Sequence, residues 1–349
     1  TNFPALPSTF AEHLQTTTER SVNTAIADID DDGITDIMTA VGPGGMGSIA
    51  PSILVAWSPF GGKNDGPRVI TSKNVFALGA GNALLRNPHG ALNVCAGSFV
   101  QGELPLVIAA QGLGGDNQIR ALQYMEIGNK RILDIVGTFQ GLTGAAVRGN
   151  GSGGTSVAAG DVDGDDLDEL IVGQMNGAGA TTLFQILDLD RVDGRIQVTK
   201  RSAPIAGMPE GYQGSGGINL AVGDVDGDGD KEIVVANAGM PDGATGNAAL
   251  KNFVRVLDVI TDGQDTISSV DLMAGMSWIQ AFGANANPSG ALDVACGNLD
   301  SDRADEILLS TQAMVTVDPE TGEVSVTHPA PNNLVRAFSL EFAQDGTYE

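Results

Sequence analysis

The segment DVDGDDLDELIVG, residues 161–173, alternates acidic residues along a short loop and continues directly into an apolar run. Three further segments repeat the pattern, beginning at Asp28, Asp224 and Asn298. In every copy a carboxylate or an amide stands at loop positions one, three, five and nine, where the oxygens can surround a hard cation. The chain therefore contains a recurrent loop that predicts metal binding.

The spacing of the loops predicts a further repeat. The four copies begin at positions 28, 161, 224 and 298, so the first interval is about twice as long as the others. Residues 97–112 fill this interval, since they align without gaps on residues 27–42 and keep the strand-like run on each side. The acidic positions are replaced there by Ser98, Val100, Gly102 and Leu106. We expect a structural repeat without a metal.

The residues around the loops predict strands. Short apolar or alternating runs occur in the third repeat at 156–159, 169–173, 181–189 and 194–200, and in the fourth at 218–222, 232–236, 253–259 and 266–272. Four-stranded units repeated radially form a β-propeller. We predict an all-β fold, a single propeller domain over residues 1–349 with five blades of four strands. Residues 334–342 also alternate, so 334–349 either close the ring or begin a sixth, incomplete blade.

The acidic loop and the strand after it resemble the FG-GAP repeat, the blade unit of integrin α-subunit propellers and of many bacterial surface proteins and fungal lectins. The resemblance covers about residues 22–310, with five units where integrins have seven. It implies calcium-binding loops on one face of the propeller. In integrins the opposite face binds the partner, so the resemblance also indicates where a ligand would lie.

The residue types in the loops favour calcium. Calcium accepts six to eight oxygen ligands in flexible geometry, whereas magnesium demands an octahedron, and no loop contains the His or Cys that zinc or copper prefers. We expect three to four calcium ions. The predicted side-chain ligands are Asp28, Asp30, Asp32, Asp36, Asp161, Asp163, Asp165, Glu169, Asp224, Asp226, Asp228, Glu232, Asn298, Asp300, Asp302 and Glu306. The predicted backbone ligands, at position seven, are the carbonyls of Ile34, Leu167, Asp230 and Ala304.

The EF-hand, which opens in the same way, is the rival interpretation of these loops. It requires a bidentate Glu at position twelve and flanking helices. Position twelve is occupied here by Thr39, Val172, Val235 and Leu309, all inside strand-like runs, which excludes the EF-hand. Position six must turn sharply, which suits Gly33 and Gly229 but not Arg303. Because Asn298 also removes a charge, we expect the loop at 298 to bind most weakly.

The charge balance excludes one class of partner and indicates a compartment. The chain has 18 Lys and Arg against 43 Asp and Glu, and 20 of these acids lie inside the four loops. With so few cationic side chains, the protein could not displace the counterions of a nucleic acid, so we expect no nucleic-acid partner. No stretch approaches the ~20 apolar residues of a membrane span. Weak calcium sites fill at millimolar concentrations, so we expect a secreted, periplasmic or cell-surface protein.

The loops on the face opposite the metals are the long, irregular ones, and they predict a ligand face. Loops on a rigid scaffold often carry binding residues. The candidates are Asn87, His89, Tyr212, Trp278 and Asn287. The alternative is that the glycines of these loops only relieve crowding around the axis. The partner on this face would be a protein or a glycan.

The expected function is that of a protein–protein or cell-surface adhesion module without catalytic residues. A carbohydrate-binding lectin is the first alternative, although two Trp and three Tyr offer few rings to stack on sugars. A polysaccharide lyase is the second, because one such family resembles this repeat in its calcium loops. Against it, the chain has few cations to receive acidic sugars.

Overall fold

A computed structural model provides the fold. It describes residues 22–41, 52–59, 68–76, 91–112, 115, 117–144, 154–175, 182–208, 217–238, 252–261, 267–271, 279–283, 286, 290–300, 302–312, 314–317, 324–328 and 334–340. This part of the chain consists of strands and turns and contains no α-helix. The expected all-β class is therefore confirmed.

The strands form five consecutive antiparallel units, which we call blades one to five. Blade one contains β1 (Val22–Ala27), β2 (Asp36–Val41), β3 (Ile53–Ser58) and β4 (Arg68–Asn74). Blade two contains β5 (Leu92–Gly97), β6 (Leu106–Gln111), β7 (Gln118–Ile127) and β8 (Lys130–Gln140). Blade three contains β9 (Thr155–Gly160), β10 (Glu169–Gln174), β11 (Leu183–Val192) and β12 (Arg195–Arg201), with β13 (Ile205–Ala206) beside β11.

Blades four and five follow the same order. Blade four contains β14 (Ile218–Gly223), β15 (Glu232–Asn237), β16 (Phe253–Thr261) and β17 (Ile267–Asp271), with β18 (Ile279–Gln280) beside β16. Blade five contains β19 (Leu292–Gly297), β20 (Glu306–Thr311) and β23 (Val335–Phe338). Between β20 and β23 the chain forms a separate hairpin of β21 (Met314–Val317) and β22 (Val324–His328).

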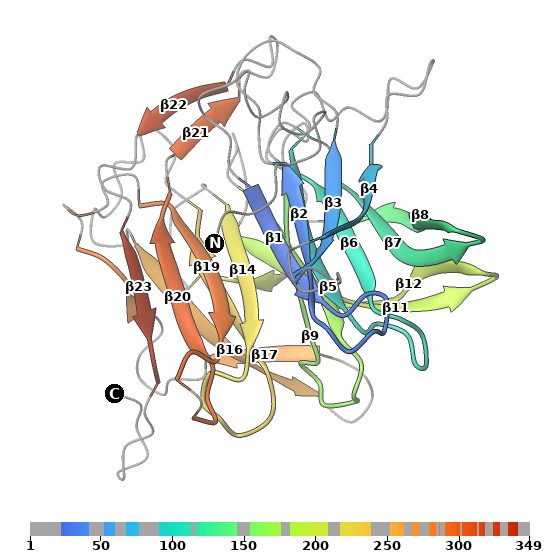
Figure 1. The fold of residues 1–349 in the computed structure, drawn as a ribbon. Coiled ribbons are helices and arrows are strands. Elements are labelled where there is room, and N and C mark those ends of the chain that lie inside the picture. The colour runs from blue at the N-terminus through green and yellow to red at the C-terminus, as the bar shows by residue number, and fades with distance from the viewer. Residues whose placement is uncertain are drawn as a thin grey trace.

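The first strand of each blade lies at the centre of the molecule. Contacts run from β1 to β5, from β5 to β9, from β9 to β14 and from β14 to β19, and these five strands line one central cavity. The loops that leave them all lie at one end, and the β21–β22 hairpin lies at the other (Figure 1). This arrangement is a β-propeller. The degenerate repeat near residue 98 is confirmed as a blade, since β5 and β6 flank it.

The C-terminal strand is placed differently from both expectations for residues 334–349. β23 pairs antiparallel with β20, so it is the third strand of blade five and neither closes the ring nor begins a further blade. The β21–β22 hairpin separates it from β20 in the sequence, which is why the repeat period does not predict its place. Residues 341–349 lie outside the described part of the chain.

Neighbouring blades are held together by shared apolar cores. Met38 and Leu54 of blade one pack in one cluster with Val107 and Leu122 of blade two. The second strands are the most deeply placed, since every residue of β6, β10 and β15 is buried. A strand that is covered on both faces needs a continuous apolar run, which explains why each acidic loop is followed by one.

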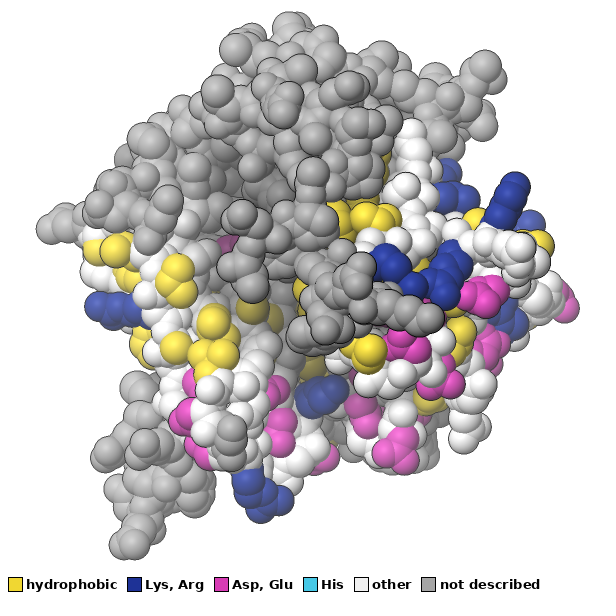
Figure 2. All heavy atoms as spheres, in the orientation of Figure 1, with side chains coloured by type: hydrophobic (Ala, Val, Ile, Leu, Met, Phe, Trp, Pro, Cys, Tyr) yellow, Lys and Arg dark blue, Asp and Glu magenta, His cyan; other side chains and the backbone are white. Residues whose placement is uncertain are grey.

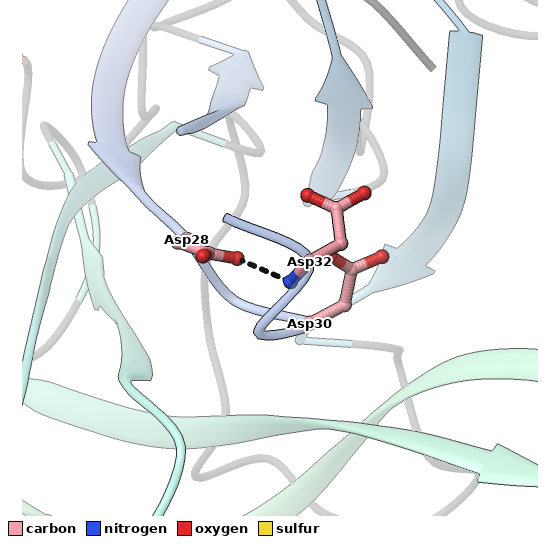
Figure 3. A group of neighbouring side chains, drawn as sticks. All are labelled: Asp28, Asp30 and Asp32. Atoms are coloured by element: carbon pink, nitrogen blue, oxygen red, sulfur yellow. Dashed lines mark hydrogen bonds between the residues drawn. The ribbon is translucent and has the colours of Figure 1, made fainter. Parts of the chain in front are cut away.

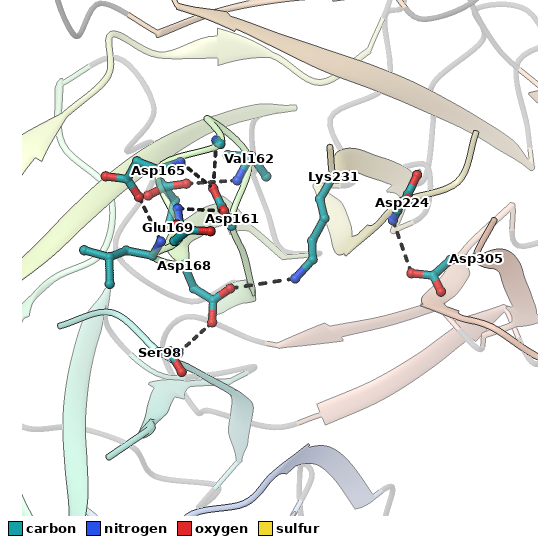
Figure 4. A network of polar contacts seen from close by, with 12 residues as sticks. Ser98, Asp161, Val162, Asp165, Asp168, Glu169, Asp224, Lys231 and Asp305 are labelled. Carbon is teal, nitrogen blue, oxygen red and sulfur yellow. Dashed lines mark hydrogen bonds and ion pairs between the residues drawn. The ribbon is translucent and has the colours of Figure 1, made fainter. Parts of the chain in front are cut away.

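Reciprocal hydrogen bonds also join the loops of neighbouring blades. Asp168 donates its backbone N–H to the carbonyl of Ser98 at 3.0 Å, and its carboxylate accepts the Ser98 N–H at 2.6 Å. Asp305 and Asp224 are joined in the same way, at 2.6 and 3.2 Å (Figure 4). Both acids stand at loop position eight. We call this arrangement the interblade clasp.

The clasp requires glycine at the end of the preceding innermost strand. A Cβ atom on Gly97 would lie 2.5 Å from a carboxylate oxygen of Asp168, and one on Gly223 would lie 2.9 Å from that of Asp305. At the matching position of blade five, Gly297 has no neighbouring atom within 4 Å of a Cβ. The three glycines are thus equivalent in sequence but not in packing.

Gly97→Ala should therefore destabilise the protein, by about 1–3 kcal/mol, because the added methyl group forces the clasp apart. Gly297→Ala is the matched control and should be neutral or stabilising by up to about 1 kcal/mol, since alanine restricts only the unfolded chain. Chemical denaturation of both variants measures the difference. Equal losses of stability in the two variants would refute the clasp.

Candidate metal centres

Four clusters of carboxylates lie in the loops that follow β1, β9, β14 and β19. In each cluster, three carboxylates bring an oxygen atom within 4.8 Å of one another. The members are Asp28, Asp30 and Asp32; Asp161, Asp163 and Glu169; Asp224, Asp226 and Glu232; and Asp300, Asp302 and Glu306. Figure 3 shows the first cluster, and Figure 2 shows acidic side chains gathered at this end of the molecule. These acidic clusters can hold metal ions.

The loops fold around their own acidic side chains. Position one accepts a backbone N–H in the first three loops, from Gly33 to Asp28, from Gly164 to Asp161 and from Gly227 to Asp224, each at 2.8 Å. Position five accepts the N–H of position seven in all four loops, at Asp32, Asp165, Asp228 and Asp302, over 2.9–3.0 Å. These turns hold the carboxylates close together through hydrogen bonds within the loop.

Left-handed backbone at position six was predicted and is found in three loops. Gly33, Asp166 and Gly229 have φ values of 80°, 70° and 111°. Among the described residues Arg303, at the same position of the fourth loop, does not adopt positive φ. The sequence interpretation overlooked position four, which is also left-handed at Asp31, Gly164 and Gly227. Two glycines and an aspartate there are the signal that could have revealed it.

Position nine anchors every loop to the core. Asp36, Glu169, Glu232 and Glu306 are all buried, with at most 5% of each residue exposed. One oxygen of each accepts the backbone N–H of position two. The donors are Ile29 at 3.2 Å, Val162 at 3.0 Å, Val225 at 2.8 Å and Leu299 at 2.6 Å. The other oxygen of Asp36 and of Glu306 is buried and has no hydrogen-bond partner.

Unpartnered buried oxygens at positions three and nine provide a test of whether a cation fits. In the described residues, one buried oxygen each of Asp30, Asp36, Asp163 and Glu306 has no hydrogen-bond partner. A buried acceptor without a partner is strongly disfavoured, and a negatively charged one more so. The donor set consists of oxygen atoms and carries a net negative charge, which suits a hard divalent cation.

Burial shifts the pKa of these carboxylates upward. It raises the pKa of Glu169 and of Glu232 to about 8, against the hydrogen bond that each accepts from a backbone N–H. Burial likewise raises the pKa of Asp36 to about 6. Neighbouring aspartates of the same loop add to each shift by repulsion. A divalent cation would reverse these shifts, since it favours the ionised form.

Two further carboxylates stand beside the clusters and were not predicted as site residues. Asp188 of β11 raises the pKa of Asp163 and Glu169 by repulsion. Asp258 of β16 has a raised pKa, mainly through burial and in part through repulsion from Asp228. Both follow a leucine that pairs with the second strand, so they lie opposite position nine. The repeated Leu-Asp pair in the third strand is the signal for them.

The fourth loop differs from the others. The amide of Asn298 donates to the carbonyl of Asp302 at 2.7 Å, whereas position one accepts hydrogen bonds in the other loops. Its third strand has Ser339 where blades three and four have an aspartate, as the pairing of β20 with β23 indicates. Fewer negative charges therefore surround this loop. The expectation that it binds a metal most weakly stays a prediction.

The predicted ligand face lies outside the described residues. Asn87, His89, Tyr212, Trp278 and Asn287 all belong to segments that the structure does not describe. Their proposed role therefore stays a prediction. No helix long and apolar enough to cross a membrane occurs in the described part of the chain.

The fold and the loops together define a β-propeller with acidic loop clusters at one end. Residues 153–184 match the FG-GAP repeat, which confirms the resemblance for the blade-three loop and the strands around it. No curated protein sequence matches the chain.

Several solved structures are distantly similar. Penicillium chrysogenum α-L-arabinanase, complexed with arabinobiose, is 12% identical with a TM-score of 0.43, and the match covers 93% of this chain and 86% of that one. Rhamnogalacturonan lyase YesW is 14% identical with a TM-score of 0.39, over 89% of this chain and 65% of that one. Bacillus licheniformis rhamnogalacturonan lyase PL11 is 15% identical with a TM-score of 0.34, over 88% and 60%.

Without divalent cations, stability should fall as pH rises from about 4.5 to about 8, the ordinary and the shifted pKa of Glu169 and Glu232. In this range the folded chain holds protons that the unfolded chain has released, so each such group contributes a slope of at most ~1.4 kcal/mol per pH unit. Denaturation at several pH values in chelator measures this slope.

Glu169→Gln is the matched variant, because an amide mimics the protonated carboxyl. The variant should reduce the pH dependence of the free energy of unfolding by the contribution of Glu169 alone. With saturating calcium, the wild-type slope should flatten, since the bound ion keeps the carboxylates ionised. A slope that is the same with chelator and with calcium would contradict this account.

Proposed function

We propose that this chain is an extracellular calcium-binding propeller in which three to four loops each hold one calcium ion. The observation that carries the proposal is the group of four carboxylate clusters, three of which lie in loops that contain a buried carboxylate oxygen without a hydrogen-bond partner. Calcium is favoured over magnesium because the loops offer several carboxylates and a backbone carbonyl in an irregular arrangement. When bound, the ion supplies positive charge that neutralises the clusters and fixes the loops.

The ions would act mainly on stability. Each loop joins the first and second strands of a blade, and the clasps of Asp168 and Asp305 connect two of the four loops to the preceding blade. Neutralising the loop therefore stabilises both the blade and its interface. A site with millimolar affinity would fill outside cells, where calcium is abundant, and this supports the extracellular assignment.

Adding calcium should raise the melting temperature of the chelated protein. At a concentration ten times the dissociation constant, each occupied site adds ~1.4 kcal/mol to the free energy of unfolding. Three to four sites should together raise the melting temperature by roughly 5 °C or more. Thermal unfolding measures the shift and calorimetric titration measures the number of ions. An unchanged melting curve would end the proposal.

Asp226→Asn and Asp300→Asn compare a strong and a weak site within one protein. Asp226→Asn should remove most of the gain from one site in calcium, and it should be neutral or stabilising in chelator because it relieves repulsion. This reversal of sign separates metal binding from a structural role of the side chain. Asp300→Asn should lose less of the calcium gain, and equal losses would contradict the ranking of the loops.

The second half of the proposal is a binding role. We infer that the end opposite the calcium loops presents long loops to a protein or glycan partner at the cell surface. Support comes from the resemblance to FG-GAP propellers and from the position of all four acidic clusters at one end (Figure 1). Asn87, His89, Tyr212, Trp278 and Asn287 are the residues proposed for this contact.

A glycan array and an incubation with uronate polymers should distinguish the three roles. An adhesion module should show no saturable glycan binding and no new ultraviolet absorbance from unsaturated sugar ends. Saturable binding of one glycan class would replace adhesion by the lectin role. Calcium-dependent release of unsaturated products would show a polysaccharide lyase. The Asp226→Asn variant is the control for the effect of calcium on each readout.

A further inference from the structure

The innermost strands of all five blades enclose a cavity of about 360 Å³ on the axis of the propeller. The second residue of each of these strands lines it. In blade order these residues are Asn23, Asn93, Ser156, Asn219 and Asp293. Apolar residues, with Val94, Val157, Leu220 and Val294 among them, also line the cavity, although polar atoms form the larger part of its surface. The cavity thus combines a polar belt with a smaller apolar part.

The amides of the belt link each blade to the next one around the ring. Asn23 donates to the carbonyl of Leu92 at 2.6 Å, and Asn93 donates to that of Thr155 at 2.7 Å. Asn219 donates to the carbonyl of Leu292 at 2.7 Å. Between blades three and four the direction of the hydrogen bond is reversed. Here the belt residue is the acceptor, since the Leu220 N–H donates to the Ser156 hydroxyl at 3.1 Å.

Asp293 is the member of the belt in blade five, and it is the one that differs chemically from the amides and the hydroxyl of the other blades. An ionised carboxylate cannot donate to a neighbouring carbonyl. Its hydrogen bond comes from the adjacent Val294 N–H, at 3.1 Å. Asp293 is accessible from the cavity although protein surrounds most of it, and this burial raises its pKa. Its charge is left without a compensating cation among the described residues that line the cavity.

The residues that line the cavity limit which chemical classes of ligand could bind there. An anion is excluded because no described lining residue is Lys or Arg and the only ionisable oxygen group is Asp293. A divalent cation is disfavoured because a single carboxylate is too few. A sugar would lack an aromatic platform, since no described lining residue is aromatic. A small organic cation would pair its charge with the carboxylate and place its short apolar part against the apolar residues of the lining.

We propose that the axial cavity binds a small primary ammonium compound, with its ammonium group at Asp293 and its alkyl chain along Val94, Val157 and Leu220. At blade five the ammonium group supplies the hydrogen-bond donors that asparagine side chains supply in blades one, two and four. This site is separate from the acidic loops and does not depend on their occupancy.

The test is calorimetric titration of the calcium-saturated protein with n-butylammonium, and with n-butanol as the uncharged analogue of the same shape. Saturating calcium prevents the amine from acting through the loops. We expect one saturable site for n-butylammonium and none for n-butanol. Absence of saturable amine binding to the wild-type protein at millimolar concentration would overturn the proposal.

Asp293→Asn is the decisive variant, because asparagine already occupies this position in blades one, two and four. It should keep the fold, checked by its melting curve, and lose about tenfold or more in amine affinity because the charge-assisted hydrogen bond is removed. Asp193→Asn, in the β11–β12 turn, is the control and should bind as the wild type does. Equal affinity in the Asp293 and Asp193 variants would place the amine elsewhere.

Discussion

The fold depends on one electrostatic constraint, which is a buried carboxylate held beside several others at the turn of a blade. Position nine of each acidic loop is buried and bonded to the backbone of position two, so it cannot move away from the other acids. Repulsion at such short range is strong in a low dielectric. The loop therefore carries a repulsion that a bound divalent cation would relieve. The apolar second strand makes this arrangement obligatory, because it pulls position nine into the core.

The same loops also set the order of the blades. Position eight of one loop bonds to the first residue of the preceding loop, at Asp168 with Ser98 and at Asp305 with Asp224. The degenerate loop of blade two has lost its acidic positions but keeps the backbone groups that the clasp uses. A loop without the acidic positions can therefore still serve in packing, which explains why the repeat near residue 98 forms a blade.

Much of the fold could be predicted from the sequence, because the acidic loop marks both flanking strands at once. The prediction failed where the chain departs from the repeat: the β21–β22 hairpin displaced the third strand of blade five, and no periodic signal marks an insertion. The acidic positions of the loops were predictable from their spacing. Asp188 and Asp258 were not, because an aspartate in a strand resembles an ordinary solvent-facing residue until the pairing places it opposite position nine.

The departures from the repeat gather where the packing constraint is weakest. Position two of the loop is buried at Ile29, Val162 and Val225, but Leu299 of blade five is 60% exposed. Gly297 likewise has open space where Gly97 and Gly223 meet the clasp of the next blade. In the described part of the chain, the loop of blade five thus forms no clasp with a following blade. In the same blade the sequence has Asn298 and Arg303 in the loop and Asp293 in the axial belt. These three differences from the repeat thus occur in the blade whose loop has an exposed position two and open space beside Gly297.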